Sequence, residues 1–325
     1  MIIPSSFNAP WWLRNSHVQT VLPLALKTQN NIPYQLQRLV LPDGDFVDVF
    51  WCEPSQPPVR DNPPVAIVLH GMGGCFASHY VPGTIRALLK HGYRVAFLHA
   101  RGCSGEPNRL PVTFHAADTS ELNHLVRTVR TKYPVAPVAV VGFSLGGSIL
   151  LKWLGETSAT AAISAAVAVC VPFDLSITAD AINQGFARLY QMYLLRRLRE
   201  LAIAKLTVHP APLNAKQIKA VKTLRDYDHR MTARINGFSS VDDYYGTASC
   251  RQYLGTITVP TLIVNAVDDP FVPPLSVPTE REMSDSVMLE LSQHGGHVGF
   301  LRSVNTRTPR YFEDRIPGFF DEYMG

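Results

Sequence analysis

The pentapeptide Gly142-Phe143-Ser144-Leu145-Gly146 lies between an apolar run of strand type, 138–141, and an apolar helical pattern over about 148–153. A serine at such a strand–turn–helix junction sits in a strained turn, where the backbone approaches itself closely and needs small neighbours. Gly142 and Gly146 meet that need because glycine has no side chain. The spacing alone also fits an ordinary glycine turn. With the strand before it and the helix after it, the stretch predicts a nucleophile elbow that exposes Ser144.

Segments of strand length alternate with helical patterns along most of the chain. We expect helices near residues 85–91 and over 119–133, and strands over 36–41, 46–51, 65–69, 94–98, 138–142, 166–171, 260–265 and 287–291. This alternation is typical of an α/β protein with a mainly parallel, twisted sheet and helices on both faces. The first two strands are separated by Pro-Asp-Gly-Asp, which predicts an antiparallel hairpin at one edge.

Three segments depart from this alternation. Residues 2–26 are broken by three prolines, so we expect an irregular segment across the surface, outside the sheet. Residues 54–64 form a polar, proline-rich loop. Residues 172–259 carry helical patterns over 181–206 and 217–224 where a further strand would be expected. The chain therefore reads as a single domain over 1–325 with a helical insertion at about 172–259, which overhangs the ends of the strands as a lid.

The apolar side chains of the first helix in this insertion fall on one stripe: Phe186, Leu189, Tyr190, Tyr193, Leu194, Leu198 and Leu201. The insertion is also basic, with Glu200 as the one acid among Arg188, Arg196, Arg197, Arg199, Lys205, Lys216, Lys219, Lys222 and Arg225. These charges fit a solvated helix face. They also fit weak contact with anionic lipid headgroups or with an acidic ligand.

Composition narrows the class of protein. The net charge is +4 and no basic-aromatic motif is present, which argues against nucleic acid as a partner. The longest apolar run, 161–173, is too short to span a bilayer. Residues 1–10 do not resemble a signal peptide. The five cysteines are scattered, odd in number and without metal-ligand spacing, so we expect reduced thiols in a cytoplasmic protein.

A nucleophilic serine needs a histidine to accept its proton and a carboxylate to orient that histidine. In this kind of fold they follow the serine in the order acid, then histidine, each after a strand. Asp268 and Asp269 both follow the strand at 260–265, and the pattern Asp-x-apolar-Val-Pro selects Asp269, with Asp268 as a turn residue. Of the two histidines after the strand at 287–291, the flanking glycines favour His297 over His294.

Two backbone N–H groups should stabilise the oxyanion: that of the residue after the nucleophile, and one from the first glycine-rich loop. The residue after the nucleophile is Leu145. The glycine-rich loop is His70-Gly71-Met72-Gly73-Gly74, and its donor is Met72. The glycine-rich loop could instead be a plain turn or a phosphate cradle. No Lys-Ser/Thr follows it, so it is not a P-loop.

At this point the sequence resembles a known family, the YheT-type branch of the α/β-hydrolase superfamily (the AB hydrolase 4 type). The segments that carry the resemblance cover nearly the whole chain: residues 15–20, 70–74, 101–109, 142–147, 242–245 and 295–300. Position 16 departs from the family's Asn-Pro-His, because it is serine. The resemblance implies the α/β-hydrolase fold and a triad of Ser144, Asp269 and His297. It also implies hydrolysis of carboxylic esters of short acyl chains, with lipid esters or acyl transfer to alcohols in eukaryotic relatives.

The expected activity is therefore that of a serine esterase that acts on a small-molecule ester, lipid esters included, through an acyl-enzyme and without cofactor or metal. Two alternatives remain, an alcohol O-acyltransferase with the same triad and a non-catalytic ligand-binding protein. The triad does not explain Arg101 and Arg109, which either bind an anionic group of the substrate or pair with Glu106 or Asp118 to hold their own loop. The sequence leaves the oligomeric state open.

Overall fold

One sheet of nine strands organises the computed structural model, which describes residues 1–26, 31–55, 62–303 and 309–324. In space the strands run in the order β1-β9-β8-β7-β6-β4-β5-β3-β2. β3 is antiparallel to β2 and to β5, and the other neighbouring pairs are parallel. The strands are β1 (Ile2–Pro4), β2 (Gln35–Val40), β3 (Phe46–Cys52), β4 (Val65–Leu69), β5 (Arg94–His99), β6 (Val138–Phe143), β7 (Ala165–Val169), β8 (Thr261–Ala266) and β9 (Val287–Ser292).

This arrangement confirms the predicted α/β class, the mainly parallel sheet and the antiparallel hairpin at one edge. The hairpin turn closes at Gly44, whose φ of +86° suits glycine. Most of the proline-rich loop predicted over 54–64 lies outside the described residues.

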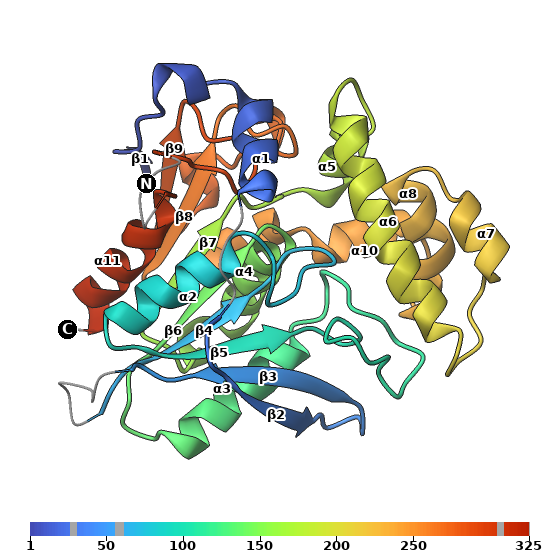
Figure 1. The fold of residues 1–325 in the computed structure, drawn as a ribbon, viewed down its shortest axis with the longest axis horizontal. Coiled ribbons are helices and arrows are strands. Elements are labelled where there is room, and N and C mark those ends of the chain that lie inside the picture. The colour runs from blue at the N-terminus through green and yellow to red at the C-terminus, as the bar shows by residue number, and fades with distance from the viewer. Residues whose placement is uncertain (27–30, 56–61, 304–308, 325) are drawn as a thin grey trace.

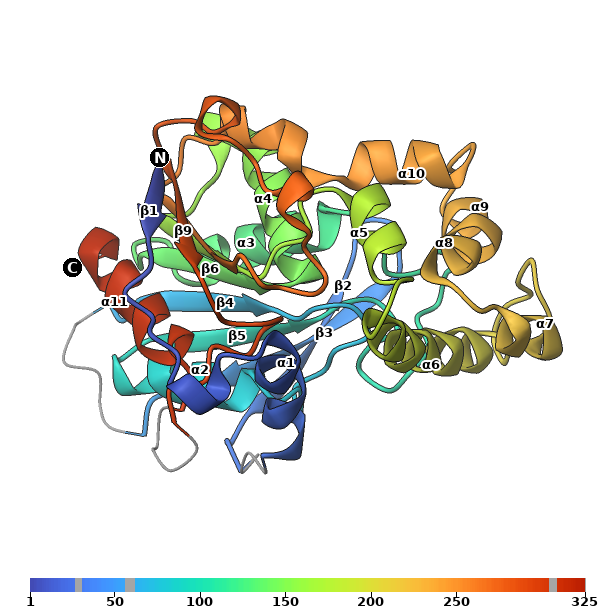
Figure 2. The same cartoon turned by 90° about the horizontal axis from the view of Figure 1, so that it is seen from above.

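Helices cover both faces of the sheet. Figure 2 shows α2 (Val81–Lys90) and α11 (Phe312–Met324) on one side, and α3 (Ser120–Lys132) and α4 (Leu145–Thr157) on the other. The alternation of side chains along β6 explains why both faces are covered. Val138 and Val140 are buried in the cluster that contains α3 and α4, whereas Ala139, Val141 and Phe143 are buried in the cluster that contains α2 and α11. A strand that is apolar on both sides needs a helical layer on each.

The expectation for residues 2–26 was wrong in two respects. β1 belongs to the sheet, because Ile2 to Pro4 pair in parallel with Leu289 to Leu291 of β9. Residues Ser16–Ala25 form a helix, α1, whose N-terminus is capped by the side chain of Asn15, which accepts from the N–H groups of His17 and Val18. Pro23 lies only two residues before the end of α1, so it shortens the helix rather than preventing it.

Between β7 and β8 the insertion folds into one long helix and several short ones, which gather beyond the carboxyl ends of the parallel strands (Figure 1). They are α5 (Leu175–Ala181), α6 (Ala187–Lys205), α7 (Ala215–Ala220), α8 (Leu224–Tyr227), a π-helical turn (Asp228–Thr232), α9 (Ala233–Ile235), α10 (Val241–Ala248) and a 3₁₀ segment (Cys250–Thr256).

The helix predicted over 181–206 is present as α6, but it begins only at Ala187. Residue 181 still belongs to α5, and the chain turns between the two helices at Gly185, whose φ is +48°. The predicted apolar stripe of α6 is also divided. Tyr190 is buried, whereas Leu189 and Tyr193 are about half exposed. The apolar residues of α6 spread over more than one face of the helix, so only some of them can pack against the rest of the protein.

Candidate active site

The serine turn has the strained geometry that its sequence predicts. Ser144 has a φ of +51° and lies directly between β6 and α4, which begins at Leu145 rather than at Ser148 as predicted. A Cβ at Gly142 would overlap the carbonyl oxygen of Gly146, and a Cβ at Gly146 would lie 2.5 Å from the carbonyl oxygen of His70. Only glycine fits at both positions, so the sequence Gly-x-Ser-x-Gly has a steric cause.

The structure brings Ser144, His297 and Asp269 together although loops after three different strands carry them. Ser144 Oγ lies 2.9 Å from His297 Nε2. His297 Nδ1 lies 2.8 Å from one carboxylate oxygen of Asp269 and 3.1 Å from the other. With the hydroxyl donating to Nε2 and Nδ1–H donating to the carboxylate, the three side chains form a continuous chain of hydrogen bonds.

Asp269 is fully enclosed while its neighbour points elsewhere. The Asp269 side chain is 0% exposed, and it also accepts a 2.8 Å hydrogen bond from the Phe271 N–H. The Phe271 ring stacks on the imidazole of His297 with centroids 3.9 Å apart. Asp268 instead accepts from the Gly296 N–H at 3.0 Å and lies 3.4 Å from His294. Burial raises the pKa of Asp268.

The histidine loop has support that the sequence did not indicate. Its backbone takes positive φ angles at Gly296, Val298 and Phe300, so it needs external contacts to hold its shape. The Val298 N–H donates to the sulfur of Cys170 at 3.0 Å, and the His297 N–H donates to the hydroxyl of Thr20 at 3.0 Å. Desolvation raises the pKa of the Cys170 thiol well above its usual value, so the thiol stays protonated. Nothing in the spacing of the chain relates Thr20 or Cys170 to His297.

The glycine-rich loop after β4 is fixed by a buried histidine. His70 donates from Nδ1 to the carbonyl of Gly71 at 2.7 Å, and its Nε2 accepts from the Ala100 N–H at 3.1 Å. Burial lowers the pKa of His70 to about 4, so the ring is neutral and can accept that bond. The Gly71 N–H donates to the hydroxyl of Tyr80 at 2.8 Å. Within the described residues, the next N–H group, that of Met72, donates no hydrogen bond.

A cavity of about 660 Å³ opens above the serine. Ser144, His297, Met72 and Leu145 line it together with residues from α1 and from the helical insertion. The two predicted oxyanion donors therefore border the same space as the serine. Within the described residues, the Leu145 N–H, like that of Met72, has no hydrogen-bond acceptor. Backbone donors that face a cavity in this way can receive a developing negative charge.

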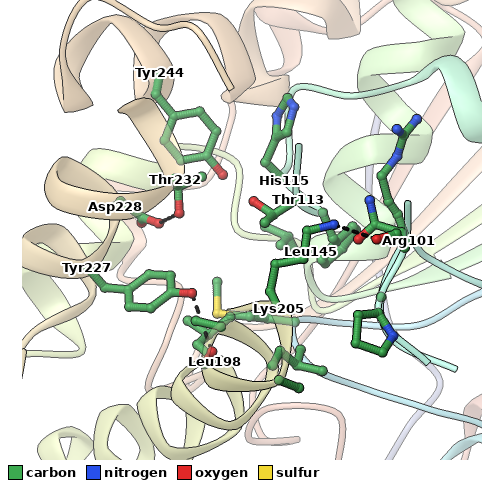
Figure 3. Close-up of a pocket in the computed structure, with 18 of the residues that line it drawn as sticks. Arg101, Thr113, His115, Leu145, Leu198, Lys205, Tyr227, Asp228, Thr232 and Tyr244 are labelled. Carbon is green, nitrogen blue, oxygen red and sulfur yellow. Dashed lines mark hydrogen bonds between the residues drawn. The ribbon is translucent and has the colours of Figure 1, made fainter. Parts of the chain in front are cut away.

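A second, smaller cavity of about 100 Å³ shares Met72 and Leu145 as lining residues with the first. Figure 3 shows its lining, with Leu145 among the labelled residues. Lys205 of α6 reaches into its wall and donates to the Asn108 carbonyl at 2.7 Å. Burial lowers the pKa of Lys205 to about 8. On the opposite wall burial raises the pKa of Asp228 to about 6. Its carboxylate accepts from the hydroxyls of Thr232 and Tyr245.

Arg101 also borders this smaller cavity, yet its charge is already neutralised. Its guanidinium binds Glu121 at 2.8 Å, Asp43 at 2.8 Å and Asp45 at 3.2 Å, with Asp118 at 3.8 Å. Arg109 donates to the carbonyl of Gly44 at 3.0 Å. Of the two predicted roles, Arg101 thus takes the structural one. One of its two predicted partners, Asp118, is among its acids, whereas the other, Glu106, pairs with Arg38.

The described residues include one group with metal-ligand atoms close together, formed by Cys170, Asp269 and His297, whose atoms lie within 4.8 Å of one another. The same atoms make the hydrogen bonds described above. A metal ion at this place would break the link between His297 and Asp269. Among the described helices, none combines the length and apolar character that crossing a membrane requires.

Comparison with known proteins agrees with this arrangement. The family model of the alpha/beta hydrolase fold matches residues 64–303. An Escherichia coli protein named "Putative esterase YheT" is 38% identical over 312 residues, which cover 95% of this chain and 91% of that protein. "Phospholipase ABHD3" of Mus musculus is 27% identical, with 97% of this chain and 78% of that protein covered. "Monoacylglycerol lipase" of Saccharomyces cerevisiae is 30% identical over 76% of this chain and 57% of that protein.

Among solved structures, the Pyrococcus furiosus esterase Pf2001 superposes with a TM-score of 0.61 at 19% identity, covering 91% of this chain and 92% of that one. That likeness concerns the fold. The match to the family model and the identity to YheT show the family as well as the fold, because both extend over most of the chain. The chain belongs to the alpha/beta hydrolase fold family, in its YheT-like branch of esterase- and lipase-like hydrolases.

Proposed function

We propose that the protein is a serine carboxylic-ester hydrolase that acts through Ser144, His297 and Asp269. The observation that carries this proposal is the unbroken chain of hydrogen bonds from Asp269 through His297 to Ser144 at the floor of a 660 Å³ cavity. The esterase and lipase names of its relatives support the same reaction class.

The proposed reaction uses these contacts in sequence. Ser144 Oγ attacks the ester carbonyl while its proton passes to His297 Nε2. Asp269 stabilises the resulting imidazolium, and the N–H groups of Met72 and Leu145 bind the tetrahedral oxyanion. His297 then returns the proton to the leaving alcohol, and an acyl-enzyme remains. Water, deprotonated by His297, attacks the acyl carbonyl; the carboxylic acid leaves and the proton returns to Ser144.

The helical insertion acts as the lid of this site. Residues of α5, α6 and α8 line the cavity above the serine, so the position of these helices sets the space for the substrate. A cavity of this volume accommodates medium-length acyl chains as well as short ones, which fits the lipid substrates that the names of some relatives state. The five cysteines are all free, which suits a cytoplasmic location.

Labelling with a fluorophosphonate, combined with p-nitrophenyl esters of increasing chain length, tests the proposal. Wild type should be labelled and should hydrolyse at least one ester, and Ser144→Ala should do neither. If wild type is neither labelled nor able to hydrolyse any of these esters, the esterase proposal is wrong, and the protein is a non-catalytic, ligand-binding member of the family. Transfer to an alcohol is tested by adding glycerol, since a new glycerol ester above the solvolysis background would make the enzyme an acyltransferase.

A further inference from the structure

The first half of α6 exposes apolar side chains where a helix on the surface of a protein normally exposes polar ones. Leu189, Met192 and Tyr193 have 49%, 55% and 54% of their surface exposed. Their spacing of three and four residues places them on one side of the helix. Phe186, directly before the helix, is also half exposed.

Helix α1 has the same unusual character. Val18, Val21 and Leu24 follow one another at intervals of three residues and are all exposed. The residues of α1 that are buried include Gln19 and Thr20, which are polar and bind the histidine loop. In α1, therefore, two polar residues face the protein and apolar residues face solvent.

These two exposed faces lie next to each other. His17 of α1 is 2.9 Å from the hydroxyl of Tyr190 in α6, and its ring centroid is 4.5 Å from that of Phe186. Figures 1 and 2 both show α1 beside the start of α6. We call the combined surface the apolar rim; it consists of Val18, Val21, Leu24, Phe186, Leu189, Met192 and Tyr193.

The apolar rim borders the opening of the active-site cavity. Leu24 from one helix and Tyr193 from the other line that cavity together with Ser144. A molecule that leaves an apolar phase at the rim would therefore reach the serine without crossing bulk water. Neighbouring exposed apolar side chains beside a cavity are typical of an interaction site.

The two helices that carry the rim are basic, although Glu200 pairs with two of their arginines, Arg196 and Arg197. Residues 11–26 and 186–199, which carry both helices up to the middle of α6, contain five arginines and no aspartate or glutamate. Arg14 and Arg188 are exposed, and the side chain of Arg196 is 78% exposed beside its partner Glu200. A surface that combines apolar side chains with arginines is complementary to one that combines acyl chains with phosphates.

We propose that the apolar rim docks on the surface of an anionic phospholipid membrane. The side chains of the rim enter the boundary between headgroups and acyl chains, and the surrounding arginines bind lipid phosphates. Docking is thus assigned to α1 and the first half of α6, not to the basic insertion as a whole. The lysines of α7 lie at the far end of the insertion, away from α1 (Figure 1). The inference concerns binding and does not require that the protein hydrolyse esters.

Co-sedimentation with vesicles tests it, using Ser144→Ala throughout so that no lipid is consumed. This protein should bind vesicles of phosphatidylcholine mixed with phosphatidylglycerol more tightly than vesicles of phosphatidylcholine alone. Adding Leu189→Ser and Met192→Ser should weaken binding by about tenfold or more, because two apolar side chains that would be partly buried in the membrane are lost. The matched control replaces Val135 and Leu275, which are 71% and 77% exposed and belong to neither rim helix, by serine and should bind like the parent.

Two double variants test how much the arginines contribute to vesicle binding. Arg188→Gln with Arg196→Gln should remove the preference for the anionic vesicles, whereas Lys216→Gln with Lys219→Gln on α7 should keep it. Equal loss in both pairs would show general attraction of a basic protein and would overturn the assignment to the rim.

Two other results would also overturn it. One is the absence of vesicle binding by the parent protein. The other is a concentration-dependent dimer, seen by light scattering, that the rim variant abolishes while vesicle binding stays undetectable, since the rim would then bind a second copy of the chain. Turnover of a water-soluble acetate ester by the rim variant in the Ser144 background should equal that of wild type, and it reports separately on the proposed function.

Discussion

The hydroxyl of Thr20 joins α1 to the loop that carries His297. It accepts a 3.0 Å hydrogen bond from the backbone N–H of His297 and donates one of 2.8 Å to the carbonyl of Ser16. The loop that it supports contains three residues with positive φ, among them two that are not glycine. A strained loop of this kind keeps its shape only while its outside contacts last.

Removing this hydroxyl should slow catalysis more than it weakens binding. Thr20→Val keeps the shape of the side chain but leaves the His297 N–H without its acceptor, at a cost of about 1 kcal/mol or more. We expect kcat to fall by about tenfold with KM little changed. Thr20→Ser, which keeps the hydroxyl, should stay within about twofold of wild type. If the valine and serine variants are equally fast with a soluble p-nitrophenyl ester, Thr20 does not position His297.

The neighbouring acids Asp268 and Asp269 should respond very differently to the same chemical change. Asp269→Asn removes the charge that stabilises the His297 imidazolium and disturbs its tautomer, so kcat should fall by about ten-thousandfold. Asp268→Asn keeps an oxygen for the Gly296 N–H and should cost only a few-fold. Initial rates for both variants decide the matter, and a larger loss for Asp268→Asn would reverse the assignment of the acid.

Two glycine-to-alanine changes should have opposite effects on stability. At Gly142 the new methyl group meets the backbone of Gly146, which cannot move without displacing the serine turn, so we expect a loss of about 3 kcal/mol or more. At Gly246, inside α10, a Cβ meets nothing within 4 Å. Gly246→Ala should stabilise the protein by about 0.5–1 kcal/mol. Urea unfolding measures both, and a tolerated Gly142→Ala would show that the turn can relax.

His70 should make the protein less stable in acid. Its pKa is lowered to about 4 in the folded protein, against an ordinary value of 6.5, so the unfolded chain takes up the proton more readily. Above pH 6.5 this difference in proton uptake has no effect on the free energy of unfolding. As the pH falls from 6.5 towards 4, it lowers that free energy by at most about 3 kcal/mol. His70→Gln, which cannot titrate, should show a shallower loss of unfolding free energy between these limits. Identical slopes for the two proteins would mean that His70 is not held neutral.

Replacing Arg101 should affect stability and not substrate choice. Arg101→Gln leaves the buried carboxylates of Glu121 and Asp45 without their cation, which typically costs about 3–5 kcal/mol. The protein that remains folded should show the same ratio of KM values for a neutral ester and for one that carries a carboxylate. A selective rise in KM for the anionic ester, without a loss of stability, would instead place Arg101 in contact with substrate.

The central part of the fold could be predicted because its signals are local. Each parallel strand is a short apolar run, and the strained turn at Ser144 requires glycine on both sides, which leaves a mark in the sequence. The N-terminal segment has no such mark. β1 is three residues long and becomes a strand only through its pairing with β9, and α1 turns polar residues inwards, which reverses the usual pattern.

The same distinction holds within the site. Ser144, His297 and Asp269 follow strands in a known order, so their positions could be predicted from spacing, and the structure brings them within hydrogen-bond distance. Cys170, Thr20 and His70 act through the backbone of other residues. Any of many buried residues could do so, and only the folded structure shows which ones are close enough. The exposure of Leu189 and Tyr193 also depends on what α6 packs against.

The order of the strands in space also has a consequence for synthesis on the ribosome. β1 pairs with β9, and the hydroxyl of Thr20 contacts the backbone of His297, so both contacts form only after residues 287–297 have been made. A chain released before β9 would contain Ser144 without the His297 that it contacts, and β1 would lack its partner strand. We therefore expect incomplete copies to be without the proposed activity.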